Sequence, residues 1–129
     1  MQLEEAFKVE LNGIYKLKNK VFPIMAQQEV ELPFIVYDLM HSIREQVIST
    51  GADGEVEARY QFDFYAETFS ELNSLKTSII SEMNTWNFAN LGVTGPYVQQ
   101  SEILDYSYSY NNNAKCHVGT IEFQIYYSE

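Results

Sequence analysis

The sequence predicts an α+β protein with a mostly antiparallel sheet of four to five strands and two helices packed on one face. Two segments repeat apolar residues at helical spacing, several others alternate apolar and polar residues, and turn residues separate the strand segments. The expected order is α-β-β-β-α-β-β. The chain of 129 residues has the length of one domain, so residues 1–129 are expected to fold as a single unit.

The first helix is expected over residues 2 to 12. Apolar residues follow one another at spacings of four, four and three, which places them on one helix stripe: Leu3, Phe7, Leu11 and Ile14. Glutamates in the first turn suit the positive end of the helix dipole, and Asn12-Gly13 supplies a stop.

Two strands are expected before the first long turn. Residues 21–25 form a short apolar run, and Pro23 within it lacks an amide donor, so this strand belongs at a sheet edge. A stronger run begins at Phe34 and continues to about residue 43, and its extension through Val47 and Ile48 stays open. Residues 51–54 have the composition of a turn.

The clearest strand signal is the alternation over residues 56–65. Its apolar positions are Val56, Ala58, Tyr60, Phe62 and Phe64, and the residues between them are mostly polar or charged. A period of two predicts an antiparallel strand that is buried on one face and polar on the other. With the preceding strand it forms a long hairpin.

The second helix is expected over residues 69 to 86. Thr68 and Glu71 match a capping box, in which the threonine oxygen accepts from a free amide and the glutamate reaches back. Five apolar residues then recur at helical spacing: Leu72, Leu75, Ile79, Met83 and Trp86. Such a stripe favours core packing over a ligand groove.

Two further strands are expected after a loop over residues 90–96. In the first, which begins at Tyr97, apolar and polar residues alternate, and its inward positions are expected to be Leu104, Tyr106, Tyr108 and Tyr110. Asparagines 111–113 form a turn, and the last strand alternates over residues 121–127. The three tyrosines allow two interpretations: they cover the core near a sheet end, or they form a subunit contact.

The charge balance argues against a nucleic-acid-binding protein. The chain has 8 basic and 18 acidic residues, a formal charge of -10, whereas phosphate binding requires basic patches. Its one basic run, Lys16, Lys18 and Lys20, has the pattern of a solvated face. No signal peptide and no run of about 20 apolar residues is present, so a cytoplasmic protein without membrane contact is expected. The single Cys116 excludes an internal disulfide.

No catalytic or metal-binding pattern stands out in the chain. His41 and His117 lie on different expected strands, without the spacing of a metal site. Cys116 neighbours His117, but adjacent strand residues point to opposite faces. The glycines at 51 and 54 join two strands, whereas a phosphate-binding loop leads into a helix. We therefore expect no catalytic residue, cofactor or metal.

Four segments carry a family resemblance that spans nearly the whole chain. They are Val-Phe-Pro at 21–23, Leu-Pro-Phe-Ile-Val-Tyr at 32–37, Arg-Tyr-Gln-Phe-Asp-Phe-Tyr-Ala-Glu-Thr at 59–68, and Ile-Glu-Phe-Gln-Ile-Tyr-Tyr at 121–127. In this order the segments resemble the tail-completion, or head–tail joining, proteins of long-tailed bacteriophages and prophages, which include tail terminators. The tyrosine- and asparagine-rich stretch at 97–113 departs from that pattern.

The resemblance implies a non-enzymatic virion assembly protein that forms a ring, with six subunits expected. Such a ring ends the tail tube and docks it to the head connector, so its partners are itself, tail-tube proteins and connector proteins. DNA crosses the ring without specific binding, as an acidic wall would favour. The implied location is the virion neck or tail, reached from the host cytoplasm during assembly, and no cofactor is implied.

Two groups of residues become candidate sites under this interpretation. The first group is the polar face of the sheet, which is expected to line the lumen of the ring: Arg59, Gln61, Asp63, Glu122 and Gln124. The subunit interface contains Arg44, Val47, Ile48, Glu55, Glu57, Tyr106, Tyr108 and Tyr110. We expect the arm over residues 44–57 to reach an adjacent subunit.

Two other functions stay open. A small adaptor or inhibitor could act as a monomer or dimer and bind a host protein. A hydrolase would need a pocket that joins His41 or His117 to carboxylates.

Overall fold

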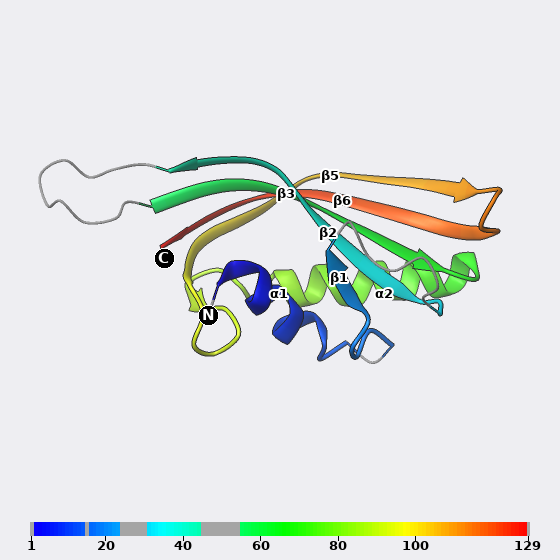
Figure 1. Ribbon diagram of the computed structural model, residues 1–129, viewed down its shortest axis with the longest axis horizontal. Coiled ribbons are helices and arrows are strands. Elements are labelled where there is room, and N and C mark those ends of the chain that lie inside the picture. Colours follow the sequence, from blue (N-terminus) through cyan, green and yellow to red (C-terminus); the bar gives the residue numbers. More distant parts are fainter. Residues whose placement is uncertain (1, 15, 24–30, 45–54, 129) are drawn as a thin grey trace, which may run out of the picture.

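The computed structural model describes residues 2–14, 16–23, 31–44 and 55–128, which form one sheet with two helices (Figure 1). The helices are α1 (Leu3–Leu11) and α2 (Phe69–Met83). The strands are β1 (Val21–Pro23), β2 (Phe34–Arg44), β3 (Glu55–Ala66), β4 (Ala89–Asn90), β5 (Tyr97–Asn111) and β6 (Cys116–Ser128). Both helices lie on the same side of the sheet, which confirms the predicted α+β class and the one-sided helix packing.

The sheet is larger than predicted and mixed. Its described strands follow the order β1-β2-β3-β6-β5-β4, which makes six strands where four to five were expected. β1 pairs with β2 in parallel, and the other pairs are antiparallel. The sheet curls into a half-barrel over the helices (Figure 1). β4 escaped prediction because two residues inside a loop carry no periodicity, while β1 lies at the edge as its proline requires.

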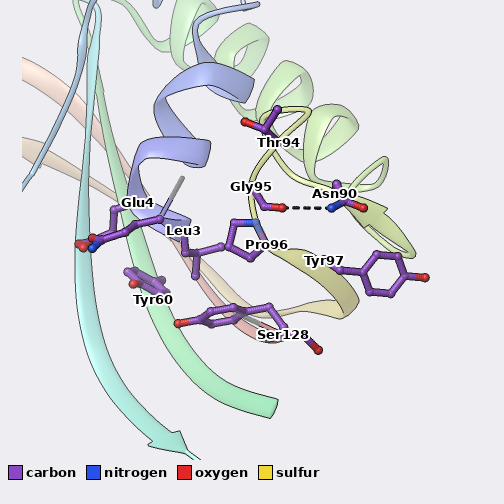
Figure 2. Close-up of a pocket in the computed structure, with 11 residues that line it drawn as sticks. Leu3, Glu4, Tyr60, Asn90, Thr94, Gly95, Pro96, Tyr97 and Ser128 are labelled. Atoms are coloured by element: carbon purple, nitrogen blue, oxygen red, sulfur yellow. Dashed lines mark hydrogen bonds between the residues drawn. The ribbon is translucent and has the colours of Figure 1, made fainter. Parts of the chain in front are cut away.

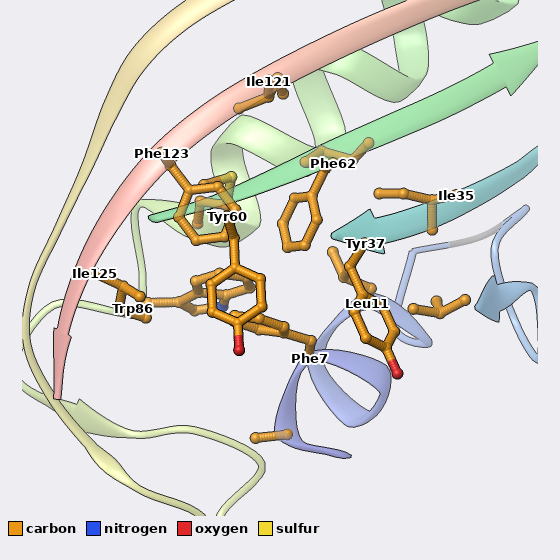
Figure 3. Packing of buried hydrophobic residues seen from close by; sticks show 14 of the residues in the cluster. Phe7, Leu11, Ile35, Tyr37, Tyr60, Phe62, Trp86, Ile121, Phe123 and Ile125 are labelled. Atoms are coloured by element: carbon orange, nitrogen blue, oxygen red, sulfur yellow. The ribbon is translucent and has the colours of Figure 1, made fainter. Parts of the chain in front are cut away.

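The ring of Phe7 in α1 packs against aromatic rings of the sheet. Phe7 is fully buried and its ring centre lies 5.1 Å from that of Tyr60, 5.3 Å from that of Phe62 and 5.5 Å from that of Trp86 (Figure 3). The predicted stripe of Leu3, Phe7, Leu11 and Ile14 is buried throughout. The aromatic residues therefore form the centre of the core, between α1 and the β3–β6 pair.

Helix α2 begins as predicted and ends early. Thr68 Oγ1 accepts from the Glu71 amide at 3.1 Å, and a Glu71 carboxylate oxygen accepts from the Glu67 amide at 3.4 Å, which confirms the capping box. The helix stops at Met83 instead of residue 86, and the Trp86 amide donates to the Met83 carbonyl three residues back. This tighter turn keeps Trp86 on the buried side, so the apolar period continues beyond the helix.

The pairing of β3 with β6 gives the sheet its two faces. Apolar residues of both strands face the helices, and Phe64 lies opposite Gly119. A Cβ atom on Gly119 would lie only 2.4 Å from the Phe64 ring, so the glycine makes room for that ring. The remaining residues of these strands face away from the helices.

The alternation in β5 differs from the prediction at Leu104. A β-bulge between Ile103 and Asp105 shifts the register against β6. Ile103 packs against the core, whereas Leu104 is 40% exposed and has no partner in β6. Beyond the bulge Tyr106 again lies opposite Ile121 on the helix side. Strict alternation of apolar and polar residues cannot predict such a bulge, because it assumes that every residue of the strand has a partner in the neighbouring strand.

Candidate functional site

The predicted polar face exists as a continuous surface on the side of the sheet away from the helices. Arg59 lies opposite Gln124, Gln61 opposite Glu122, and Asp63 opposite Thr120, so the five predicted residues share this face. We call this surface the outer face. It continues onto β2 and β5, because residues opposite one another in an antiparallel pair share a face.

Hydrogen bonds connect the side chains of the outer face. Asp63 accepts from Gln61 Nε2 at 3.1 Å and from Thr120 Oγ1 at 2.7 Å. The Gln124 amide donates to the Glu57 carboxylate, which places Glu57 on this face as well. The polar side chains of the outer face therefore bind one another.

The outer face is strongly acidic. Its described part has one guanidinium, that of Arg59, which lies 4.0 Å from the Glu122 carboxylate. Against this single cation stand six carboxylates: Asp38, Glu57, Asp63, Glu102, Asp105 and Glu122. A surface with this balance repels phosphate groups.

The three predicted interface tyrosines lie on the helix side of the sheet in two different environments. Tyr106 is half-buried, with the Lys76 ammonium 4.3 Å from its ring centre, and burial raises its pKa. Tyr108 and Tyr110 are 46% and 48% exposed. Tyr106 therefore covers the core, while the other two extend the row of rings into solvent.

Tyr108 and Tyr110 belong to a cluster that we call the aromatic patch: Phe69, Tyr108, Tyr110 and His117. The Tyr108 hydroxyl lies 2.7 Å from His117 Nδ1, and the Phe69 and Tyr108 ring centres are 5.1 Å apart. The Tyr110 ring meets His117 edge-on at 4.9 Å. Helix α2 and the β5–β6 hairpin thus build the patch together, and the sequence had not linked Phe69 to it because the two segments are far apart in the chain.

The predicted interface residues do not form one cluster. Glu55 pairs with Ser128 at one end of β6, and Tyr110 pairs with His117 at the other. Eleven residues of strand separate these positions by about 36 Å. Arg44 pairs with Val56 beside Glu55 at the end of the long β2–β3 hairpin (Figure 1). The expected extension through 47 and 48, and the turn at 51–54, lie outside the described residues.

The residues considered for chemistry do not converge. His41 lies opposite Arg59 on the outer face, whereas His117 lies in the aromatic patch. Cys116 is buried, and burial raises the pKa of its thiol. Within the described ranges no three or more histidine, cysteine, aspartate or glutamate side chains are placed to hold a metal ion.

A hollow of about 710 Å³ opens beside the N-terminus of α1 (Figure 2). Its lining is Gln2, Leu3, Glu4, Tyr60, Asn90, Thr94, Gly95, Pro96, Tyr97, Tyr127 and Ser128. Glu4 is its one charged side chain, and burial followed by the charge of Glu4 raises the pKa of the Tyr60 hydroxyl. The lining has no histidine, and neither does a second hollow of about 410 Å³ beside α2. The hollow has no acid–base pair of the kind a hydrolase needs.

Two large apolar side chains next to β4 are exposed to solvent: Phe88 directly before the strand, and Val93 in the loop between β4 and β5. Phe88 is 76% exposed and Val93 is 83% exposed. Both have a positive φ, 59° and 69°, a region that costs a residue other than glycine about 1–2 kcal/mol. The sequence indicated only a loop here, because backbone strain at a valine leaves no trace in composition.

A pair of carboxyl groups anchors this loop to the helices. Glu10 at the end of α1 accepts from the Gly92 amide at 2.9 Å and is hydrogen-bonded to Glu82 of α2. Burial, then the hydrogen bond and charge of Glu10, raise the pKa of Glu82 to about 7. The indole N–H of the buried Trp86 acts in the opposite direction and lowers the pKa of Glu82. Among the described residues this N–H has no hydrogen-bond partner at normal distance. Glu82 therefore keeps its proton to a higher pH than an exposed glutamate does.

These features define an α+β half-barrel protein whose outer face is acidic and whose two ends present exposed aromatic and apolar side chains. Within the described part of the chain, neither helix combines the length and apolar character that crossing a bilayer requires.

Comparison with known proteins finds a relative in fold alone. A search of solved structures finds a chain from the virion of a native gene transfer agent particle, with a TM-score of 0.64 and 10% identity. The similarity covers 98% of this chain and 95% of that chain. No protein-family model and no curated protein matches the sequence. At this identity the likeness establishes the common fold, over nearly the full length of both chains.

Proposed function

We propose that this protein is a non-enzymatic virion assembly protein that forms a ring at the head–tail junction. In this role it ends the tail tube and docks the finished tail to the head connector. The observation that supports the proposal most is the likeness over 98% of the chain to a component of a gene transfer agent virion. The resemblance of the sequence to tail-completion proteins points to the same class.

Two open strand edges support assembly with further copies. β1 covers only the first part of β2, so no described strand pairs with residues 38–44 on that side. β4 covers only Tyr97 and Val98 of β5, and Asn87 Oδ1 accepts from the Ser101 amide. Along residues 102–111 no strand in the described part of the chain pairs with this edge. An open edge is a template for pairing with another chain, and a ring of subunits can satisfy it.

The interface candidates fit contacts at both ends of such a subunit. One end has Arg44, Glu55 and the predicted arm through Val47 and Ile48, and the other has Tyr108 and Tyr110. Tyr106 serves the core, and Glu57 belongs to the outer face. In the proposed ring the arm over residues 44–57 of one subunit reaches the next.

The outer face suits the channel wall of the ring. Its six carboxylates outnumber its one guanidinium, so the face repels the DNA backbone and DNA passes without specific binding. The partners are then tail-tube and head-connector proteins, and the location is the virion neck, with the host cytoplasm as the site of assembly. The proposed protein has no membrane contact and no cofactor.

Deletion of the gene from its phage or prophage tests the role. The expected result is filled heads and separate tails of irregular length, counted by electron microscopy, with joined particles restored by the wild-type chain. A variant that lacks residues 47–54 is expected to restore few joined particles, because the arm is shortened. Normal joined particles after gene deletion would contradict the proposal, and full rescue by the shortened variant would contradict the role of the arm.

A monomeric or dimeric adaptor that binds a host protein is the second candidate. The aromatic patch favours it, because exposed tyrosine and phenylalanine are enriched at contacts with other proteins. In that case gene deletion leaves virions intact. A hydrolase has less support, since neither hollow contains a histidine.

A further inference from the structure

Two exposed apolar surfaces lie at opposite ends of the molecule. One is the loop tip, which we define as Phe88 and Val93, and the other is the aromatic patch of Phe69, Tyr108, Tyr110 and His117. The Phe88 amide donates to the carbonyl of Val98, which lies opposite Tyr127, whereas Tyr110 lies opposite His117. Ten residues of β6 therefore separate the two surfaces by about 33 Å.

The loop tip is held firmly although its side chains are in water. The Gly95 amide donates to the Leu91 carbonyl at 2.8 Å, the Leu91 amide to the Pro96 carbonyl at 3.0 Å, and Asn90 Nδ2 to the Gly95 carbonyl at 3.1 Å (Figure 2). A Cβ on Gly95 would lie 2.2 Å from the Leu91 carbonyl oxygen, so the turn is also sterically fixed. These contacts hold the turn around Val93, and the bond from the Phe88 amide to the Val98 carbonyl, at 2.8 Å, ties the backbone at Phe88 to β5, while both side chains stay exposed.

The aromatic patch is ordered in the same way. Tyr108 binds His117 through its hydroxyl, and its ring meets Phe69 edge-on. Tyr and Phe rings fixed by such contacts lose little conformational freedom when a partner covers them. The aromatic patch is therefore a preorganised surface that apolar side chains of a partner can contact.

Carboxyl groups lie near the loop tip, whereas the patch end has lysines together with Glu67, which follows Ala66 opposite His117. Glu10 binds the loop at Gly92 and is bonded to Glu82, and Glu4 lines the adjacent hollow with Gly95. Near the patch, Lys76 lies over the neighbouring Tyr106 ring, and Lys115 stands at the turn of the β5–β6 hairpin. Attraction between these groups orients the loop end of one copy toward the patch end of another.

We propose that the loop tip of one copy of this chain docks on the aromatic patch of the next copy. The inference rests on the proposed ring and names the surfaces that close it. A ring requires two different surfaces of the same chain to meet head to tail, and these two surfaces lie at opposite ends, with carboxyl groups near one and lysines near the other. Phe88 and Val93 are then the apolar anchors of the contact.

Cysteine cross-linking tests the contact. In a Val93→Cys, Tyr110→Cys double variant, mild oxidation is expected to link successive subunits into a ladder of covalent multimers on a denaturing gel. The matched control is Val93→Cys with Ser107→Cys, because Ser107 lies on the opposite face of the same strand and is expected to give no ladder. The native Cys116 is buried, and wild-type protein controls for it.

A second pair of variants covers the case in which the geometry blocks disulfide formation. Phe88→Ser with Val93→Ser is expected to raise the concentration for half-assembly about tenfold or more, while Val9→Ser, at an exposed position of α1 outside both surfaces and both open strand edges, leaves it unchanged. Far-UV circular dichroism confirms that each variant is folded. If the protein assembles but shows neither the cross-linked ladder nor a change in the concentration for half-assembly, this contact is wrong and the proposed ring is not affected. A wild-type protein that never assembles would overturn both.

Discussion

Removal of the Phe7 ring is expected to cost more stability than any other single truncation in α1. The ring is fully buried and contacts the rings of Tyr60, Phe62 and Trp86 as well as two others (Figure 3). The ring lies between α1 and the sheet, so its removal leaves a cavity where the helix packs against the strands.

The size of the effect follows from this burial. Truncation of a buried phenylalanine to alanine costs about 3–5 kcal/mol, and aromatic pairs contribute about 0.5–1.5 kcal/mol each beyond area burial, so Phe7→Ala belongs in the upper part of the range at about 4 kcal/mol. The whole domain is stable by about 5–15 kcal/mol. With an unfolding entropy of about 2.1 cal/mol/K per residue, this loss lowers Tm by about 15 °C.

Urea unfolding followed by Trp86 fluorescence and far-UV circular dichroism measures the change. Trp86 is the one tryptophan of the chain, and its ring stacks on Phe7. The matched control is Phe88→Ala, which removes the same atoms from a side chain that is 76% exposed and is expected to change the free energy of unfolding by less than about 0.5 kcal/mol. A loss below about 1 kcal/mol for Phe7→Ala at an unchanged denaturant slope would refute the described packing of α1.

Three further changes test the packing, the capping and the carboxyl pair. Gly119→Ala places a methyl group 2.4 Å from a buried phenylalanine ring and is expected to cost about 1–3 kcal/mol in urea unfolding. Thr68→Ala removes the N-cap of α2 and is expected to cost about 1 kcal/mol by the same assay. Glu82 has a pKa raised from 4.5 to about 7, so the folded state binds more protons than the unfolded state between these values. Stability is therefore expected to fall as pH rises from about 4.5 to 7, and Glu82→Gln is expected to flatten this slope.

Each of these changes has a matched control or a contradicting outcome. Gly13→Ala meets only an ordinary contact at 3.4 Å and is expected to be nearly neutral, and an equal loss at both glycines would contradict the steric explanation. Thr77→Ala alters an exposed threonine within α2, and a similar loss there would remove the case for capping. If the Glu82→Gln variant keeps the wild-type pH slope, the raised pKa of Glu82 is not the source of that slope.

The sequence predicted the parts of the fold that depend on local periodicity. The alternation in β3 placed Phe62 and Phe64 inward and Gln61 and Asp63 outward, as the structure has them. The capping box at Thr68 fixed the start of α2. These predictions succeeded because each depends on neighbours within a few residues, where side-chain direction repeats with the period of the element.

The features that escaped prediction depend on contacts distant in sequence. Leu104 was expected to point toward the core. A β-bulge between Ile103 and Asp105 shifts the pairing register against β6 instead, so that Leu104 has no partner there. Phe69 joins the aromatic patch through residues about forty positions later in the chain. The exposure of Val93 depends on a loop bonded to Glu10 near the N-terminus. Such features need the tertiary fold before any residue pattern can reveal them.

The most direct test of the proposed ring is the mass of the purified protein in solution across a wide range of concentrations. Native mass spectrometry and light scattering are expected to show a closed species near six times the 15.0 kDa of one chain, at high concentration or on the ends of tail tubes. A monomer or dimer under all these conditions, tail tubes included, would contradict the ring and favour the adaptor.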